Sequence, residues 1–393
     1  MSLNSTPAGE RVHIGFFGMR NAGKSSVVNR FTGQNLAVVS DTKGTTTDPV
    51  YKAMELLPIG PVMIIDTPGF DDEGSLGELR VKKTNEVLRK VDVAVLVVDK
   101  TAGISEFDRG IIGQFKKREI PFVIAFNKSD LSENADVINK GALRECINSD
   151  EDLKSVVEVS AVSGEGIDLL KIAVSQKCRL NDSEKYIASD LVNSGDVVVL
   201  VVPIDSAAPK GRIILPQQQT IRDLLDKGAV TMVCTPAKLS ETIELCNKKP
   251  SLVITDSQAF EEVDKIVPDD IKLTSFSILM ARYKGFLETA LKGVKALDYL
   301  KEEDKILICE GCTHHRQCDD IGTVKIPKWL KKYTGKELLI NTCSGREFPE
   351  DLSEYAVVIH CGACMLNERE VVSRMNMAVS QNVYFTNYGI VIA

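Results

Sequence analysis

The sequence predicts an α/β protein with three successive domains, and three observations support this fold class. Apolar runs of strand length alternate with stretches of helical periodicity, which is typical of parallel sheets covered by helices. A glycine-rich loop joins the first apolar run to a helix. Two polar breaks, at 175–190 and 267–270, divide the 393 residues into segments of domain size.

The glycine-rich loop runs from Gly18 to Ser25 and fits the phosphate-binding pattern G-x-x-x-x-G-K-[ST]. A strand at 12–17 precedes it, and a helix at 25–31 follows whose free N–H groups face a bound anion. We expect Lys24 to reach the β- and γ-phosphates and the Ser25 hydroxyl to bind Mg²⁺. The residues expected to bind the phosphates are Gly18, Gly23, Lys24, Ser25 and Ser26.

The segment from Asp66 to Gly69 supplies a second part of a nucleotide site. It follows an apolar run at 62–65, so Asp66 lies at the end of a predicted strand. We expect Asp66 near Mg²⁺ and the Gly69 amide near the γ-phosphate.

The segment from Asn127 to Asp130 indicates that the base is guanine. It follows the predicted strand 121–126, and its carboxylate can accept hydrogen bonds from N1–H and the 2-amino group. Adenine lacks that amine, and a buried unpaired acceptor is costly, so Asp130 should favour GTP over ATP. The residues expected to bind the base are Asn127, Lys128 and Asp130, with Ser160 and Ala161 supporting the guanine carbonyl.

The order and spacing of these motifs resemble the small-GTPase domain of the translation-factor class over residues 11 to 175. Asn21 and the segment from Gly44 to Asp48 look closest to its potassium-activated branch, in which the asparagine helps to hold K⁺. The resemblance implies that Thr46 binds Mg²⁺. It also implies that the residues taking part in hydrolysis are Lys24, Asn21, Thr46 and Gly69.

Phe70 departs from the Ras-like pattern, because it stands where those chains carry the glutamine that orients the attacking water. A phenyl ring cannot orient water. We therefore expect slow intrinsic hydrolysis, with K⁺ supplying the missing positive charge.

Composition narrows the class of protein further. Hydrophobic residues make up 44% and charged residues 26%, as in ordinary globular proteins, and the formal net charge is −7. An acidic chain lacks the basic surface that nucleic acid requires, so no nucleic-acid partner is expected. The sequence shows no signal peptide and no run of about 18 apolar residues, so we expect a cytoplasmic protein with no membrane partner.

The domain boundaries follow from the two polar breaks. We predict a GTPase domain at 1–175, a small α/β domain at 190–266 and a third α/β domain at 270–393. The middle domain contains no histidine and no nucleophile motif, so we interpret it as structural and expect it to mediate dimerisation. The third domain is expected to begin with a strand at 272–276 and a helix at 277–300, and to end with a strand at 383–391.

Two groups of cysteine and histidine follow strands of the third domain. Strand 305–309 leads to Cys312 and His314, and strand 356–359 leads to His360, Cys361 and Cys364. Because carboxyl ends of parallel strands share one edge of a sheet, the two groups can converge. Thiolate richness suits tetrahedral Zn²⁺ or an iron-sulfur cluster, and the residues alone leave both open.

The same five residues resemble the HydF family, GTPase maturation factors of [FeFe]-hydrogenase, whose C-terminal pattern is C-x-H followed after an interval by H-C-x-x-C. The resemblance implies a [4Fe-4S] cluster held by Cys312, Cys361 and Cys364. It further implies a dimeric or larger scaffold, working with radical-SAM maturases, that carries a transient diiron precursor to apo-[FeFe]-hydrogenase. His314 and His360 are either fourth ligands or hydrogen-bond partners of the cluster.

Two other functions remain open at this point. One is a zinc-stabilised regulatory GTPase, and the other is a tRNA-modification or ribosome-assembly GTPase of the potassium-dependent branch. The sequence also leaves open what GTP hydrolysis drives and whether Cys309, Cys318 or Cys343 binds metal.

Overall fold

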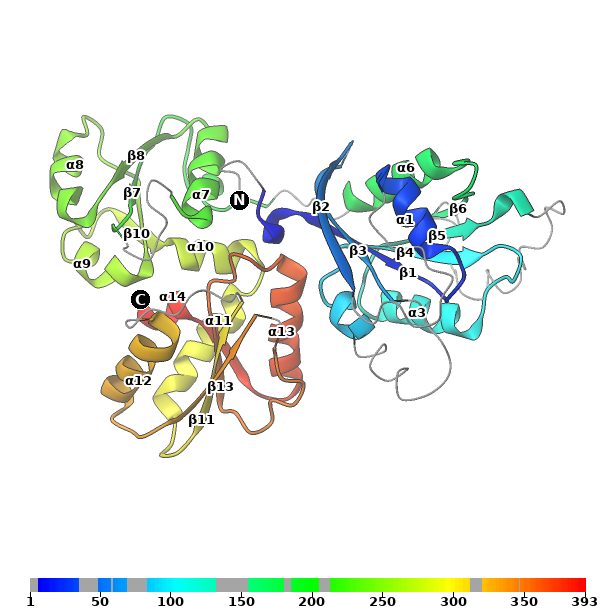
Figure 1. Ribbon diagram of the computed structural model, residues 1–393. Helices are drawn as coiled ribbons and strands as arrows, with labels where there is room; N and C mark the ends of the chain where they lie inside the picture. Colours follow the sequence, from blue (N-terminus) through cyan, green and yellow to red (C-terminus); the bar gives the residue numbers. More distant parts are fainter. Residues whose placement is uncertain are drawn as a thin grey trace. The chain divides into compact units, whose positions relative to one another are not determined.

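A computed structural model describes residues 6–34, 49–57, 59–68, 83–131, 155–179, 185–204, 213–311, 320–345 and 347–393. The chain divides into two compact units, Met1–Ser183 and Glu184–Ala393, which are described separately below (Figure 1).

The first unit contains a six-stranded sheet in the order β2-β3-β1-β4-β5-β6. Only β2 runs antiparallel to its neighbour in this sheet. The strands are β1 (Val12–Phe17), β2 (Val50–Leu56), β3 (Gly60–Asp66), β4 (Val93–Asp99), β5 (Phe122–Asn127) and β6 (Val156–Glu158). Its helices include α1 (Lys24–Thr32), α3 (Glu106–Lys117) and α6 (Ile167–Arg179), and residues 83–88 are also helical. Short 3-10 turns lie at η1 (Ala8–Glu10) and η2 (Ser129–Leu131).

Helices cover both faces of this sheet, as Figure 1 shows. Helices α1 and α6 pack on one face through side chains such as Phe31 and Leu170, and α3 packs on the other through Phe115. The central strand β4 is therefore buried on both faces, which explains its unbroken apolar run. The parallel strands bring the predicted nucleotide motifs to one edge of the sheet.

The second unit begins with a four-stranded parallel sheet in the order β10-β9-β7-β8. Its strands are β7 (Val197–Val201), β8 (Val230–Cys234), β9 (Leu252–Thr255) and β10 (Lys272–Ser275). Its helices are α7 (Leu215–Asp226), α8 (Leu239–Leu245), α9 (Phe260–Asp264) and α10 (Phe276–Tyr283), with the turns η4 (Ser189–Leu191), η5 (Pro236–Lys238) and η6 (Ser257–Ala259). Helices α7 and α10 pack on one face, and α8 and α9 on the other.

The assignment of strand 272–276 to the third domain is wrong. Strand β10 pairs in parallel with β9, with Leu273 opposite Val253, so it completes the sheet of the middle domain. The polar break before it is a turn within that domain, in which Ile271 N–H donates to Pro268 O at 2.9 Å. A proline-containing turn between a helix and a strand thus has the same sequence signature as a domain boundary.

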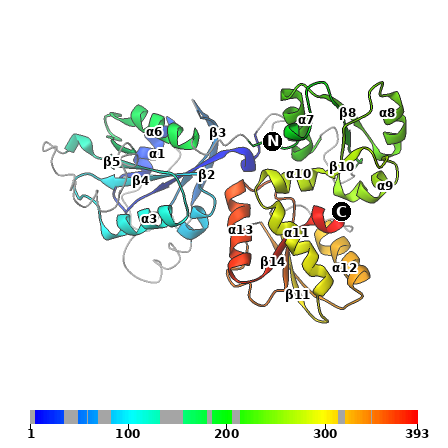
Figure 2. The ribbon, with the colours of Figure 1, turned by 180° about the vertical axis from the view of Figure 1, so that it is seen from behind.

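The third sheet is also four-stranded and parallel, in the order β12-β11-β13-β14. Its strands are β11 (Lys305–Glu310), β12 (Leu339–Ser344), β13 (Val357–His360) and β14 (Tyr384–Asn387). Its helices are α11 (Leu287–Lys295), α12 (Ile326–Thr334), α13 (Glu368–Ser380) and α14 (Tyr388–Ile392), with the 3-10 turn η7 (Ala296–Tyr299) and the π-helical turn η8 (Ile321–Lys325). Helices α12 and α13 lie on opposite sides of the sheet (Figure 2).

Two predicted elements of this region differ from the structure. The helix expected at 277–300 is broken at Gly285, whose φ of 75° is incompatible with helix, into α10 and α11. The strand expected at 383–391 ends at Asn387, because the Asn387 side chain caps α14 by accepting a hydrogen bond from Ile390 N–H at 2.8 Å.

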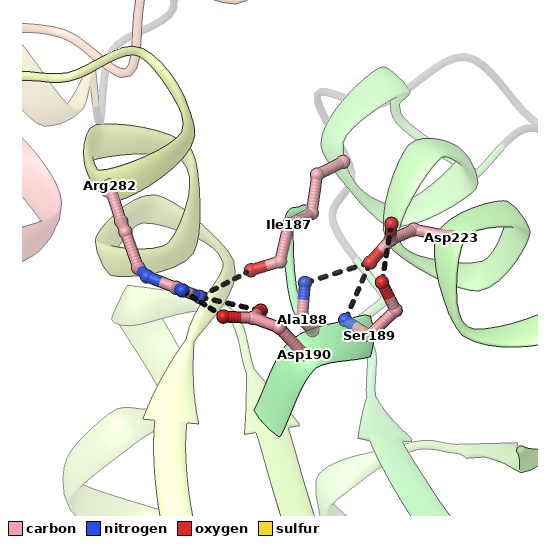
Figure 3. A network of polar contacts seen from close by, with 6 residues as sticks. All are labelled: Ile187, Ala188, Ser189, Asp190, Asp223 and Arg282. Atoms are coloured by element: carbon pink, nitrogen blue, oxygen red, sulfur yellow. Dashed lines mark hydrogen bonds and ion pairs between the residues drawn. The ribbon is translucent and has the colours of Figure 1, made fainter. Parts of the chain in front are cut away.

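The linker predicted at 175–190 is shorter than expected, because α6 continues to Arg179. Its distal part is held within the second unit, as Figure 3 shows. Asp223 of α7 accepts hydrogen bonds from the N–H groups of Ala188 and Ser189, both at 2.8 Å. Arg282 of α10 binds the Asp190 carboxylate, and it donates to Ile187 O at 3.5 Å. The segment entering the middle domain is thus fixed to two of its helices.

Candidate functional site

The phosphate-binding loop lies between β1 and α1, and its lysine is paired with the second motif. Lys24 Nζ lies 2.5 Å from Asp66 Oδ1, and Ser25 Oγ donates to Asp66 Oδ2 at 3.0 Å. Lys24 is only 7% exposed, and the Asp66 carboxylate balances its charge. The residues expected to bind the phosphates and Mg²⁺ therefore lie together.

Two glycines of this loop are required by close contacts. A Cβ on Gly18 would lie 2.4 Å from Val97 O, and one on Gly23 would lie 2.2 Å from Asn127 Nδ2. Gly23 also has φ 80°, in the left-handed region. The backbone can thus approach its neighbours, and an anion, in a way that no larger residue would permit.

Asn127 joins three parts of the predicted nucleotide site. Its Nδ2 donates to Ala22 O at 2.9 Å, and its Oδ1 accepts from Ala161 N–H at 3.1 Å. The phosphate loop, the end of β5 and the loop after β6 are therefore connected through one buried amide. The neighbouring Ser160 is fully buried, and its carbonyl accepts from Gly164 N–H at 2.8 Å.

Asp99 is a member of this site that the sequence analysis missed. Its carboxylate accepts a hydrogen bond from Lys128 Nζ at 2.6 Å, and Lys128 has φ 66°. Burial acts to raise the pKa of Asp99, but hydrogen bonds from Lys128 and Thr101 outweigh this effect and lower the pKa. The sequence does indicate Asp99 as a candidate, because it ends the apolar run of β4 at the same edge of the sheet.

The structure describes two of the remaining residues discussed for the nucleotide site, Asp130 and Asn21. Asp130 is exposed at the turn η2, where a base can reach its carboxylate. Asn21 lies in the phosphate loop with φ 63°, a conformation that asparagine tolerates better than most residues. Thr46, Gly69 and Phe70 lie outside the residues that the structure describes.

The thiol residues follow adjacent strands of the third sheet. Cys309 of β11 lies opposite His360 of β13, and Cys361 N–H donates to Cys309 O at 2.8 Å. The Cys361 sulfur accepts hydrogen bonds from Gly311 N–H at 3.0 Å and Ala363 N–H at 3.4 Å. Gly311 immediately precedes Cys312, so the end of β11 approaches Cys361, as the strand order predicts.

Burial raises the pKa of the Cys361 thiol, and the two backbone N–H groups act against that rise. Burial likewise raises the pKa of Cys364, while the Lys284 charge opposes it. Donors and cations directed at a sulfur stabilise its thiolate form, which is the form that binds metal. A second thiol pair lies nearby, with Cys343 Sγ 3.0 Å from Cys309 Sγ across neighbouring strands.

His360 is 1% exposed, and both of its ring nitrogens contact protein groups. Its Nδ1 lies 3.0 Å from Cys361 O, and its Nε2 lies 3.1 Å from Arg374 Nη1. Burial and the Arg374 charge lower the pKa of His360 to about 3, so the imidazole is neutral. An imidazole with both nitrogens engaged fits a hydrogen-bonding role better than a metal-ligand role.

Arg374 is a second residue that the sequence analysis missed. It is 3% exposed and lies 2.7 Å from Glu370 Oε1, and it also donates to Gly345 O at 2.8 Å. Its local sequence carries no signal, because its role depends on contacts with distant elements.

Comparison with known protein families decides the identity. Residues 187–285 match the family model of the hydrogen maturase F dimerization domain, and residues 288–393 match that of the hydrogen maturase F tetramerization domain. The chain belongs to the hydrogen maturase F family. Residues 13–128 match a third model, described as a 50S ribosome-binding GTPase, so this hydrogen maturase F chain begins with a P-loop GTPase domain.

The individual relatives described below are GTP-binding proteins, and each match covers less than half of this chain. The chain is 34% identical over 155 residues to the tRNA modification GTPase MnmE of Desulforamulus reducens, covering 39% of this chain and 32% of that protein. It is 28% identical over 182 residues to the GTPase Era of Caldicellulosiruptor saccharolyticus, covering 45% and 58%. The chain thus spans about a third of the length of such tRNA modification GTPases. A crystal structure of a probable GTP-binding protein engB covers 43% of this chain and 100% of that one, at 27% identity and a TM-score of 0.35.

The cysteine ligands that the structure describes at the third sheet fit the iron-sulfur cluster implied by the resemblance to the hydrogen maturase F family. Cys361 and Cys364 are soft ligands, and backbone N–H groups are directed at the Cys361 sulfur. Cys312 and His314 lie outside the described residues. Within the described ranges, no three Cys, His, Asp or Glu side chains are grouped to hold a metal ion. Over the same ranges, no helix has the length and hydropathy to cross a bilayer.

Proposed function

We propose that this protein is a GTP-hydrolysing iron-sulfur scaffold that assembles or carries a diiron precursor for apo-[FeFe]-hydrogenase. Its membership of the hydrogen maturase F family supports the proposal. The observation that carries it is the Cys361 sulfur, which accepts two backbone N–H groups where β13 and β11 end together. Sulfur in such a setting is suited to hold an iron cluster.

The residues that would hold a [4Fe-4S] cluster are Cys312, Cys361 and Cys364. Three thiolates leave one iron with an exchangeable ligand, which a carrier needs in order to hold and release a second metal unit. His314 remains a candidate for that position. His360 is assigned to hydrogen bonding, because Cys361 O and Arg374 already engage its two nitrogens.

The GTPase domain would bind GTP and Mg²⁺ through the loop that carries Lys24 and Ser25. In the present arrangement Lys24 and Ser25 both contact Asp66. A bound γ-phosphate would replace Asp66 as the partner of Lys24, and Asp66 would then turn toward Mg²⁺. Asn21 would help to hold K⁺, and the γ-phosphate would order the loops that carry Thr46 and Gly69.

Hydrolysis would act as a conformational switch on the scaffold. Such domains order loops around the γ-phosphate and release them after hydrolysis. A ligand shifts an equilibrium only by its differential affinity for two states, so the switch must act through an interface. The partners expected at that stage are a second copy of this chain, the radical-SAM maturases and apo-[FeFe]-hydrogenase.

Anaerobic purification followed by metal and sulfide analysis tests the proposed function. We expect a brown protein containing iron and acid-labile sulfide, with an EPR signal after reduction. A colourless protein with stoichiometric zinc would instead establish the zinc-stabilised GTPase and contradict the scaffold.

A further inference from the structure

Helix α10 ends in a turn that fixes the position of Lys284. Gly285 N–H donates to Arg282 O at 3.0 Å, and Phe286 N–H donates to Ala281 O at 3.0 Å. This pair of bonds, with Gly285 in the left-handed region, is a Schellman ending. Phe286 then packs edge-on against Phe385 of the third sheet, with ring centroids 6.0 Å apart. Lys284 therefore stands on a rigid turn where the chain passes from the second sheet to the third.

The Lys284 side chain extends to the loop that carries two of the proposed cluster ligands. Lys284 is 8% exposed, and its Nζ donates to Ala363 O at 2.6 Å and Leu366 O at 3.1 Å. These two carbonyls lie on either side of Cys364 in the sequence. A buried ammonium group thus binds the backbone on both sides of a ligand.

Ala363 connects this contact to the other ligand. Its N–H is directed at the Cys361 sulfur, at 3.4 Å, while its C=O accepts from Lys284. Ala363 has φ 53°, a conformation that residues other than glycine adopt rarely and that surrounding contacts must maintain. The bond from Lys284 is one of those contacts, so it helps to aim an N–H group at sulfur.

Lys284 also places a positive charge in the surroundings of the Cys364 thiol. A cation near an iron-sulfur cluster favours the reduced, more negative form, and hydrogen bonds to sulfur act in the same direction. Arg374 is a second buried cation near Cys361, but its guanidinium is 2.7 Å from the Glu370 carboxylate.

We propose that Lys284 is a positioning residue for the cluster: it holds the Cys361–Cys364 loop in the ligating conformation and raises the reduction potential of the bound cluster. The proposal rests on the proposed function, because it requires a cluster at these thiols. A purely structural lysine would satisfy the two carbonyls without affecting the potential.

Three variants separate these roles. Lys284→Met removes the charge and both hydrogen bonds, Lys284→Arg retains a cation with donors, and Lys292→Met removes a charge from an exposed position on α11. Each variant and the wild type are reconstituted anaerobically as the full chain. The readouts are the midpoint potential, from an EPR-monitored titration, and the rate of iron loss to a chelator. Far-UV circular dichroism and elution volume report on folding.

We expect Lys284→Met to shift the midpoint potential to a more negative value, because a positive charge is removed. We also expect it to lose iron roughly tenfold faster, because two hydrogen bonds from a charged donor are lost. Lys284→Arg should restore most of the wild-type potential, and Lys292→Met should match the wild type. If folded Lys284→Met retains no cluster, the positioning role is supported, and the Arg variant still reports the effect of charge.

A wild-type potential in Lys284→Met would overturn the inference, as would an equal shift in Lys284→Met and Lys284→Arg. Failure of the proposed function would look different, because the wild type itself would then bind zinc or no metal.

Discussion

The nucleotide site and the thiol site both lie at the carboxyl ends of parallel strands, but different interactions hold them. At the nucleotide site, Lys24 and Asp66 pair with each other, so a ligand can enter by exchange of charged partners. At the thiol site, Cys361 is buried and its sulfur accepts two backbone N–H groups. The buried cations Lys284 and Arg374 each have partners of their own. The first arrangement suits a ligand that comes and goes, and the second suits a cofactor that stays.

The largest effect is expected when a cysteine of the thiol site is replaced, and it is a loss of bound iron. Cys361→Ala should lose most of the bound iron, because it removes a ligand together with the sulfur that two N–H groups address. Iron and sulfide per protomer after reconstitution measure this. Cys246→Ala, which removes a half-buried thiol of the middle domain, is the matched control and should retain full iron. Full iron in Cys361→Ala would show that the ligand set is wrong.

Asp130→Asn addresses the nucleotide site. The amide cannot accept both guanine donors, so kcat/KM for GTP should fall by roughly one to two orders of magnitude. The amide can donate to a 2-keto group, so preference should move toward xanthosine triphosphate. Rates with both nucleotides measure the switch, and an unchanged ratio would mean that guanine is recognised elsewhere. Bound iron should not change.

Exchange of K⁺ for Na⁺ is expected to have a smaller effect, on the rate of GTP hydrolysis. GTP hydrolysis should be several-fold faster in K⁺ than in Na⁺, because Phe70 cannot orient water and an ion near Asn21 can supply charge. Asn21→Ala should abolish the difference between the two salts. Phosphate release at equal ionic strength is the measurement. Equal wild-type rates in the two salts would remove the assignment to the potassium-activated branch.

The smallest effect on iron is expected for His360→Ala. Loss of a buried imidazole leaves Arg374 without one acceptor and should lower the free energy of unfolding by about 2 kcal/mol. Much of the iron should nevertheless remain, because no thiolate is lost. Chemical denaturation and iron content are measured on the same preparation. Iron loss as complete as in Cys361→Ala would make His360 a ligand.

The two sites also differ in how far the sequence predicts them. The nucleotide motifs are local, because each carries its own polar groups at the end of its own strand. In the structure Lys24 pairs with Asp66, and Asn127 donates to Ala22 O of the phosphate loop. Even the missed Asp99 follows the same rule.

The thiol site depends on contacts between distant segments. The cysteines and the strands that lead to them are visible in the sequence, but Lys284 and Arg374 reach them from other helices, and no local pattern marks either residue. The misplaced strand β10 has a similar cause, because a proline turn within a domain resembles a boundary between domains. Sequence periodicity identifies elements, whereas the sheet that each element joins is decided by packing.

Separation of the two sites is tested most directly with Lys24→Ala. Iron content and activation of apo-[FeFe]-hydrogenase are measured on the same anaerobic preparation, beside the wild type. We expect full cluster content with poor activation, because in the proposed mechanism Lys24 would bind phosphates in a different domain from the thiols and would act only through the conformational switch. Loss of the cluster would show that the nucleotide acts in assembly, and wild-type activation would show that GTP is dispensable for transfer. Either result would contradict a nucleotide switch that acts on a scaffold already loaded with its cluster.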